Sequence, residues 1–428
     1  MKPSIRPRQL FADGGIYAAT SLAGAALSFL ILPVYIAYLG KEGLGTLEVL
    51  TAGSTGLTLI VGQGLPTAWF RQRIDHRGPE RRIFETTLIW YAIGSSAIAL
   101  ALLSAIGPWL AAHFTPEIPF RPFWLLACVS ACAAVVSDMF GVGLQADQRS
   151  LQYAAFMLAR RVLSLGAIVL FVVVLRRGVL GKLSGETLAA LALSLMVFVW
   201  LRPQWPTRGS RQMLSAAIAY GLPLLPHGAA MQIIAMADRF VLGHFLGLGA
   251  VGVYSLGYRT ANVLETINGG MGSAYRALFM KSAPALESAS WGEVAARLVR
   301  MELLLMAAAS FGAQLLSLGM RELLLVAHID EHVFAESYHV TYIVCFGLFA
   351  HAAYALFATP IIYTQGAIGR LPLISAAAAS VNLLGCVLFI PRNGLLAAAW
   401  ATAASHVTIA LGAFLVGRKL VPLARPWR

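Results

Sequence analysis

A stripe of polar side chains runs along one apolar segment in the first fifth of this sequence. Its members are spaced three or four residues apart: Glu48, Thr51, Thr55, Thr58 and Gly62. At about 100° per residue, these positions share one face of a helix. A shift of 207 residues places a second polar set beside Arg259: Ser255, Tyr258, Asn262, Glu265 and Gly269. Two matching polar faces favour a hydrated cavity that both sets line, and hydrogen bonding between helices is the simpler alternative for the threonines.

Ionisable groups inside apolar segments are costly and are therefore candidates for function. Three carboxylates, Glu48, Glu265 and Asp138, are such candidates.

Arginines supply the matching cations. Arg160 and Arg161 lie about as far beyond the turn near Asp147 as Asp138 lies before it, so one of them is expected to pair with Asp138. The second guanidinium is then left to bind an anion such as phosphate. The predicted substrate-cavity residues are Arg259, Arg160, Arg161, Asn262, Thr55 and Tyr258.

One motif would favour an enzyme. The residues from His328 to His332 have the H-x-x-E-H form of inverted zinc peptidases, but they lie in a predicted outward loop and Glu336 is too close to be a third ligand. The four cysteines are expected to be core residues, and no phosphate-binding GxxxxGK[ST] loop occurs. The sequence therefore predicts a protein that is not an enzyme, with no catalytic residues, no metal site and no cofactor.

The composition determines the class of protein that must position these groups. Hydrophobic residues make up 58% of the 428, and charged residues only 12%, against about 25% charged in soluble domains. This excludes a soluble enzyme and a nucleic-acid-binding domain, despite the net charge of +13. We expect an all-α polytopic membrane protein with about twelve transmembrane helices. Their predicted ranges are 14–38, 44–69, 84–112, 119–144, 151–175, 184–201, 213–237, 250–275, 297–320, 337–362, 371–390 and 394–417.

Basic residues predict the orientation. With the N-terminus inside, 21 of the 32 lysines and arginines lie in inward segments and eight in outward loops. The positive-inside rule then places both termini in the cytoplasm. The expected location is the bacterial inner membrane.

An internal repeat divides the chain. At the same 207-residue shift, Gly40 falls on Gly247 and Gly45 on Gly252. In each half, the two glycines lie between the first two predicted helices. Six helices per half give two parallel repeats, whose interface commonly holds a transport path. The predicted domains are a six-helix bundle over 1–201, a cytoplasmic linker over 202–212 and a second bundle over 213–428. In the second bundle, Pro223 and Pro226 predict that the first helix is kinked. Asp238 and Arg239 are expected to form an interfacial ion pair at the end of that helix.

Two segments carry a family resemblance. YGLPLLPHGAAMQIIAMADRFVLGHFLGLGAVGVYSLGYRTANVL (Tyr220–Leu264) resembles the start of the second half of Wzx-type oligosaccharide flippases, with the "GLPL.P", "DRF.LG" and "G.VGVYSL.Y" stretches in order. LPVYIAYLGKEGLGTLEVL (Leu32–Leu50) resembles the matching N-terminal turn. These flippases belong to the polysaccharide biosynthesis proteins of the multidrug/oligosaccharidyl-lipid/polysaccharide (MOP) exporter superfamily.

The resemblance implies two six-helix bundles in a V, like those of the multidrug and toxin extruders (MATE), and alternating access. In such a transport cycle, Glu48, Glu265 and Asp138 are predicted to serve ion coupling, with either H+ or Na+ as the coupling ion. The implied substrate is an isoprenyl-pyrophosphate-linked oligosaccharide for surface polysaccharide or lipopolysaccharide (O-antigen) synthesis. Membrane lipid, polymerases and glycosyltransferases are the expected partners, and nucleic acid is not. Two alternatives stay open: a MATE-type cation-coupled drug antiporter, and a polytopic polysaccharide polymerase or glycosyltransferase.

Overall fold

The computed structural model describes most of the chain. It covers residues 30–73, 78–201, 209–282, 335–363 and 368–420, with isolated positions 16, 19–21, 23, 24, 26–28, 76, 311 and 322. Every secondary-structure element in these ranges is a helix, and the described residues contain no strand. Within the described ranges, eight helices are long and apolar enough to cross a membrane. The prediction of an all-helical, multi-pass membrane protein is confirmed.

The compact units of the chain meet near Gln232. Unit 1 comprises Met1–Thr20 and Val34–Gln232, and unit 2 comprises Ser21–Pro33 and Ile233–Arg428. The predicted bundles instead meet at the 202–212 linker, of which the structure describes only the last four residues. Residues 213–232, predicted to belong to the second bundle, thus group with unit 1.

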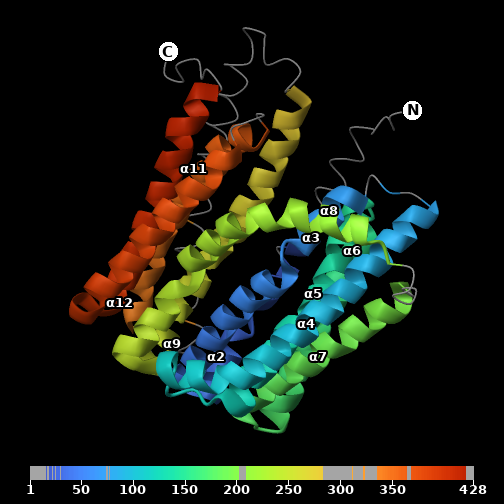
Figure 1. The fold of residues 1–428 in the computed structure, drawn as a ribbon. Coiled ribbons are helices and arrows are strands. Elements are labelled where there is room, and N and C mark those ends of the chain that lie inside the picture. Colours follow the sequence, from blue (N-terminus) through green and yellow to red (C-terminus); the bar gives the residue numbers. More distant parts are fainter. Residues whose placement is uncertain are drawn as a thin grey trace. The chain divides into compact units, whose positions relative to one another are not determined.

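Unit 1 is built from long helices and short turns between them. Its long elements are α2 (Leu32–Gly62), α4 (Gly78–Phe114), α5 (Leu125–Ala146), α6 (Ser150–Ile168) and α7 (Gly178–Leu201). Its short elements are α3 (Leu65–Arg73), η1 (Phe120–Trp124), η2 (Val169–Val174), α8 (Arg211–Gly221) and η4 (Leu222–Leu224). Helix α5 packs against α4 and α7, and the three run side by side in Figure 1.

Unit 2 contains fewer described elements. They are α9 (Leu225–Ser282), which starts in unit 1, α11 (Ala335–Tyr363), the short η7 (Ile368–Arg370) and α12 (Leu371–Leu420). Helices α11 and α12 pack along each other. The predicted helix over 297–320 lies almost wholly outside the described residues.

The repeated glycines have the same backbone conformation in both units. Gly40 has φ 65° and ψ −174°, and Gly247 has φ 79° and ψ 170°. Each glycine has non-helical dihedral angles within a long helix, Gly40 in α2 and Gly247 in α9, and interrupts that helix at a kink. Because side chains disfavour positive φ, glycine is the residue suited to such a break. The 207-residue repeat inferred from sequence therefore corresponds to a repeated structural feature.

The predicted helix over 44–69 is wrong in one respect, since the structure divides it into α2 and α3. Gln63 and Gly64 have positive φ values of 46° and 71°. A Cβ on Gly64 would lie 2.6 Å from the backbone of Gly221, so this break lets α3 and α8 approach closely. At the predicted kink around Pro223, the short 3-10 turn η4 separates α8 from α9.

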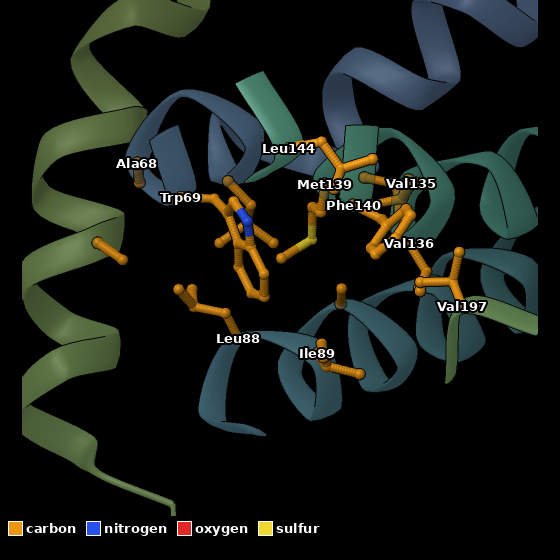
Figure 2. Packing of buried hydrophobic residues seen from close by; sticks show 14 of the residues in the cluster. Ala68, Trp69, Leu88, Ile89, Val135, Val136, Met139, Phe140, Leu144 and Val197 are labelled. Carbon is orange, nitrogen blue, oxygen red and sulfur yellow. The ribbon is translucent and has the colours of Figure 1, made fainter. Parts of the chain in front are cut away.

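The core of unit 1 forms around Trp69. Its indole is fully buried and lies 5.8 Å, ring to ring, from Phe84. Side chains from α3, α4, α5 and α7 complete this cluster, and Figure 2 shows Leu88, Met139 and Val197 among them. The core therefore fixes α5, the helix that carries Asp138.

Candidate functional site

The polar stripe of α2 satisfies most of its own hydrogen bonds. The Thr55 hydroxyl donates to the backbone carbonyl of Thr51 at 2.8 Å, and the Thr58 hydroxyl donates to the backbone carbonyl of Ser54 at 2.9 Å. Thr55 is exposed, whereas Glu48 is buried. The threonines thus need no partner on another helix, which leaves the exposed face of Thr55 open to a ligand.

The matching positions on α9 repeat this burial pattern. Ser255, which corresponds to Glu48, is buried, and Asn262, which corresponds to Thr55, is exposed. Tyr258 is buried and Arg259 half-buried. The repeat thus extends from the backbone break to the accessibility of the polar face in each unit.

Asp138 pairs with Arg160, one of the two arginines predicted from the sequence. The Arg160 guanidinium donates to Asp138 Oδ1 at 2.6 Å, and each side chain remains about one-third exposed (36% and 35%). The exposure leaves both groups accessible to a further partner.

A charge cluster extends this pair from α5 and α6 to α7. Arg161 is exposed and interacts electrostatically with Glu186. Glu186 accepts a hydrogen bond at 2.6 Å from Lys182, a buried lysine one turn earlier on α7. We call Asp138, Arg160, Arg161, Lys182 and Glu186 the unit 1 charge cluster. With three cations and two carboxylates, it carries a net positive charge.

The predicted Asp238–Arg239 ion pair forms, but these residues do not end their helix as the sequence analysis expected. Both side chains are buried, at 0% and 2% exposed, because α9 continues past them to the break at Gly247. Arg239 donates to Asp238 Oδ1 at 2.6 Å and to the carbonyl of Ala235 at the same distance. Its guanidinium also lies 4.1 Å from the ring centre of Tyr258, a cation–π geometry.

Hydrogen bonds connect this buried pair to α12. Asp238 Oδ2 accepts from the Tyr254 hydroxyl at 2.5 Å and from the Thr402 hydroxyl at 3.2 Å. Thr402 in turn accepts from the Asn382 amide at 3.2 Å. These contacts join α9 on both sides of Gly247 to α12 on both sides of its own break at Gly394. We call Asp238, Arg239, Tyr254, Asn382 and Thr402 the unit 2 clamp.

Glu265 lies against two histidines that the sequence analysis did not select. Its Oε2 is 3.2 Å from His351 Nδ1 on α11. The His351 ring stacks on His406 of α12, with centroids 4.7 Å apart and 28° between planes. Of the three predicted carboxylates, Glu265 thus joins a cluster of titratable groups. The signal in the sequence was a histidine within each of two apolar runs.

A second ionic network lies at one end of unit 1. Arg73 at the end of α3 and Arg81 in α4 both donate to Asp147, which follows α5, and both contact Glu85. Burial alone raises the pKa of Asp147, but the hydrogen bonds and charges of the two arginines lower it below its ordinary value. The network brings two predicted inward segments, 71–82 and 147–149, to the same end of unit 1.

The described residues contain no group of three or more metal-ligating side chains arranged to hold a metal ion. The segment from His328 to His332 lies outside the described residues. Among the described parts of the chain, the charged clusters above are therefore the chemical features to explain.

Comparisons with known proteins identify relatives of this architecture. A family model described as polysaccharide biosynthesis protein matches residues 10–279. No curated protein matches the chain. The solved structures with a similar fold include the lipid II flippase MurJ in an inward closed conformation, with a TM-score of 0.76, 12% identity, and coverage of 93% of this chain and 86% of MurJ.

Multidrug transporters have a similar fold as well. The MATE transporter DinF-BH, in complex with R6G, matches with a TM-score of 0.64 and 17% identity, over 99% of this chain and 98% of its own. The Vibrio cholerae MATE transporter VcmN, in its bent form, matches with a TM-score of 0.62 and 16% identity, over 96% of both chains. At such identities the likeness establishes the fold alone, which is the MATE-like fold predicted from the sequence.

Proposed function

Since the chain belongs to the polysaccharide biosynthesis protein family, we propose that it is a flippase for isoprenyl-pyrophosphate-linked oligosaccharide. It moves the lipid-linked sugar across the inner membrane by alternating access, for the synthesis of surface polysaccharide or lipopolysaccharide. The fold shared with a lipid flippase and with drug transporters supports a transport function. It is not an enzyme in this proposal, and it requires no cofactor.

The observation that carries the proposal is the depth of the unit 1 charge cluster. Arg160 lies ten residues into α6, about 15 Å from its start at 1.5 Å per residue. This is near the middle of a hydrocarbon core about 30 Å thick. A partly exposed ion pair at that depth is costly against lipid tails. The exposed side of Arg160 and Arg161 therefore faces a hydrated path.

The charge of the cluster suits a pyrophosphate. Arg160 and Arg161 are adjacent in sequence, and Asp138 binds the first of them at hydrogen-bond distance. A phosphate oxygen replaces one carboxylate contact without leaving a buried charge behind, because both groups of the pair are one-third exposed. Guanidinium groups bind phosphate in bidentate geometry and stay charged at any working pH. In unit 2, the half-buried Arg259, the buried Tyr258 and the exposed Asn262 belong to the same predicted set of ligands.

We place both termini in the cytoplasm. The network of Arg73, Arg81, Glu85 and Asp147 supports this orientation, because it groups at one end of unit 1 two segments that the basic residues assign to the inside. The backbone N–H of Ser210 donates to Thr87, which brings the end of the predicted cytoplasmic linker close to the start of α4. Polymerases and glycosyltransferases are the proposed partners, since they make and consume the lipid-linked sugar.

Leaflet-specific protection of a lipid-pyrophosphate-oligosaccharide in proteoliposomes tests the proposal. We expect the wild-type protein to move the lipid between leaflets. Arg161→Gln should slow this movement about tenfold or more, because a charge-assisted hydrogen bond contributes about 1.5–3 kcal/mol. Arg177→Gln, at the exposed turn between α6 and α7, is the matched control and should retain the wild-type rate.

Other outcomes would redirect the proposal. Movement that is equal in wild type and Arg161→Gln would keep the flippase but reject the unit 1 charge cluster as its phosphate site. Uptake of organic cations without movement of any lipid-linked sugar would favour the cation antiporter. In that case Glu48→Gln or Glu265→Gln should abolish transport and Arg259→Ala should not.

A further inference from the structure

Unit 2 contains a chain of titratable side chains that decreases in exposure from one end to the other. The Glu265 side chain is 38% exposed and that of His351 is 16% exposed. His406 is 4% exposed. The three come from different helices, α9, α11 and α12, so they respond to any movement among these helices.

His406 is buried at a cost. Neither of its ring nitrogens has a hydrogen-bond partner among the described residues. A neutral imidazole has one donor and one acceptor, and a buried polar group without a hydrogen-bond partner destabilises the folded protein. The ring is also closely packed, since a Cβ on Gly347 of α11 would lie 3.3 Å from its Cδ2. A leucine would fill this position without the cost, so the imidazole requires a functional explanation.

The stacked histidines hold at most one proton between them. Their ring centroids are 4.7 Å apart, and two like charges at such a distance in a protein interior repel strongly. A proton on His351 is stabilised by the Glu265 carboxylate at 3.2 Å, whereas His406 has no carboxylate at that distance among the described residues. A second proton on the pair is therefore strongly disfavoured.

Other charged and titratable groups surround this cluster. Tyr354 on α11 stacks on His351, with ring centroids 5.6 Å apart and 12° between planes. Tyr258 on α9 interacts electrostatically with Glu265 and with the Asp238–Arg239 pair. On α12, Thr402 lies one turn before His406 and belongs to the unit 2 clamp. The net charge of the clamp pair is zero, so the Glu265 carboxylate is the main charge that acts on the histidines.

The donor atoms of the cluster favour a proton over a metal cation. Hard cations such as sodium require several oxygen ligands, as calcium and magnesium do. Here one carboxylate lies beside two imidazoles. Imidazole changes its protonation between about pH 5 and 8, the range in which a cell maintains a proton gradient.

We propose that Glu265, His351 and His406 form the proton-coupling site of the transporter, which takes up and releases one proton in each cycle. The proton adds to an imidazole nitrogen lone pair and leaves as H+, with no other bond made or broken. When it is bound, the Glu265–His351 ion pair holds α9 to α11. When it leaves, the carboxylate loses its counter-charge, which favours a different arrangement of these helices. This inference rests on the proposed transport function.

Histidine NMR of the full-length protein in nanodiscs tests proton binding separately from transport. Ring nitrogens labelled with ¹⁵N are assigned with His351→Gln and His406→Gln, and His339→Gln on the exposed face of α11 is the control. We expect His351 and His406 to titrate together, and removal of either ring to shift the midpoint of the other. Two independent titrations, or two rings that stay neutral down to about pH 5, would overturn the proposal.

Transport under imposed gradients tests the coupling. In proteoliposomes, an inward or outward pH gradient should change the rate of lipid flipping, and a sodium gradient should not. For His351→Gln and His406→Gln, the ratio of rates with and without the pH gradient should fall to unity, while His339→Gln keeps the wild-type ratio. Stimulation by sodium alone, or by the pH gradient equally in all variants, would contradict proton coupling at this site. A complete lack of flipping together with coupled NMR titration would instead reject the proposed substrate.

Discussion

The two aspartate–arginine pairs of this protein share one geometry and have opposite surroundings. In each pair a guanidinium nitrogen lies 2.6 Å from a carboxylate oxygen. Asp138 and Arg160 in unit 1 are about one-third exposed, whereas Asp238 and Arg239 in unit 2 are almost fully buried. The contact distance is therefore no guide to the role of either pair.

Burial and additional partners account for the difference. Asp238 accepts hydrogen bonds from Tyr254 and Thr402, and Arg239 packs on the ring of Tyr258. These contacts compensate the desolvation of two charges, which a single ion pair seldom does. The Asp138–Arg160 pair has no comparable shell among the described residues and can exchange a partner with a ligand. We therefore propose that the buried pair stabilises unit 2 and that the exposed pair serves transport.

The largest predicted effect is on stability after removal of one member of the buried pair. Asp238→Ala should destabilise unit 2 by about 3–5 kcal/mol, because it leaves the Arg239 charge buried without its carboxylate. Thermal unfolding of the purified protein in detergent measures this as a lowered midpoint. Asp238→Leu combined with Arg239→Met should recover much of the loss, since an apolar pair has no charge to desolvate. A midpoint equal to that of Asp138→Ala would refute the contrast between the pairs.

A smaller effect is predicted when the buried pair loses one hydrogen bond. Tyr254→Phe removes the hydroxyl that donates to Asp238 Oδ2 and leaves the acceptor with fewer partners. We expect a loss of about 1–3 kcal/mol in the free energy of unfolding. Tyr220→Phe, at an exposed position, is the control and should change the unfolding midpoint little. If both variants unfold alike, the hydroxyl does not stabilise the clamp.

The network around Asp147 is intermediate in burial between the two pairs, since the Asp147 side chain is 14% exposed. Its contribution to the free energy of unfolding depends on pH. Burial raises the pKa of Asp147, but the hydrogen bonds and charges of Arg73 and Arg81 outweigh it, so this pKa is lowered in the folded protein. The stabilisation is thus present at neutral pH and is lost as pH falls below the ordinary value of 3.8. The difference in unfolding midpoint between wild type and Asp147→Asn should be largest near neutral pH and should shrink in acid. A difference that does not change with pH would mean that the carboxylate charge is not responsible.

The smallest effect on stability is predicted for the exposed pair. Asp138→Asn should change the free energy of unfolding by less than about 1 kcal/mol, the range of solvated ion pairs. Its effect should appear in transport, because the Asp138 carboxylate then no longer competes with the pyrophosphate for Arg160. Flipping rates measured against substrate concentration would detect a changed apparent affinity. A large loss of stability with unchanged affinity would show that this pair is structural, like the buried one.

Local sequence patterns were sufficient for much of the fold. The apolar runs predicted the multi-pass helical class, because a helix satisfies its own backbone hydrogen bonds in lipid. The shared positions of Gly40 and Gly247 predicted a repeated break, since a positive φ favours glycine wherever it occurs. The break at Gln63 and Gly64 was missed. This break allows the close approach of Gly221, which lies 157 residues later in the chain, so no local pattern reveals it.

The candidate sites also contain features that the local sequence predicted and features that depend on distant segments. Residue types alone selected Asp138, Arg160 and Glu265, because charge in an apolar segment is visible in the sequence. Only the tertiary structure showed that Asp238 and Arg239 are buried and that His351 and His406 stack beside Glu265. Burial and the contacts of one helix with another depend on segments that are distant in sequence, so no local pattern records them. The sequence by itself determined which apolar segments carry charged groups, and the packing of α9, α11 and α12 decided which of these groups lie together and beside which histidines.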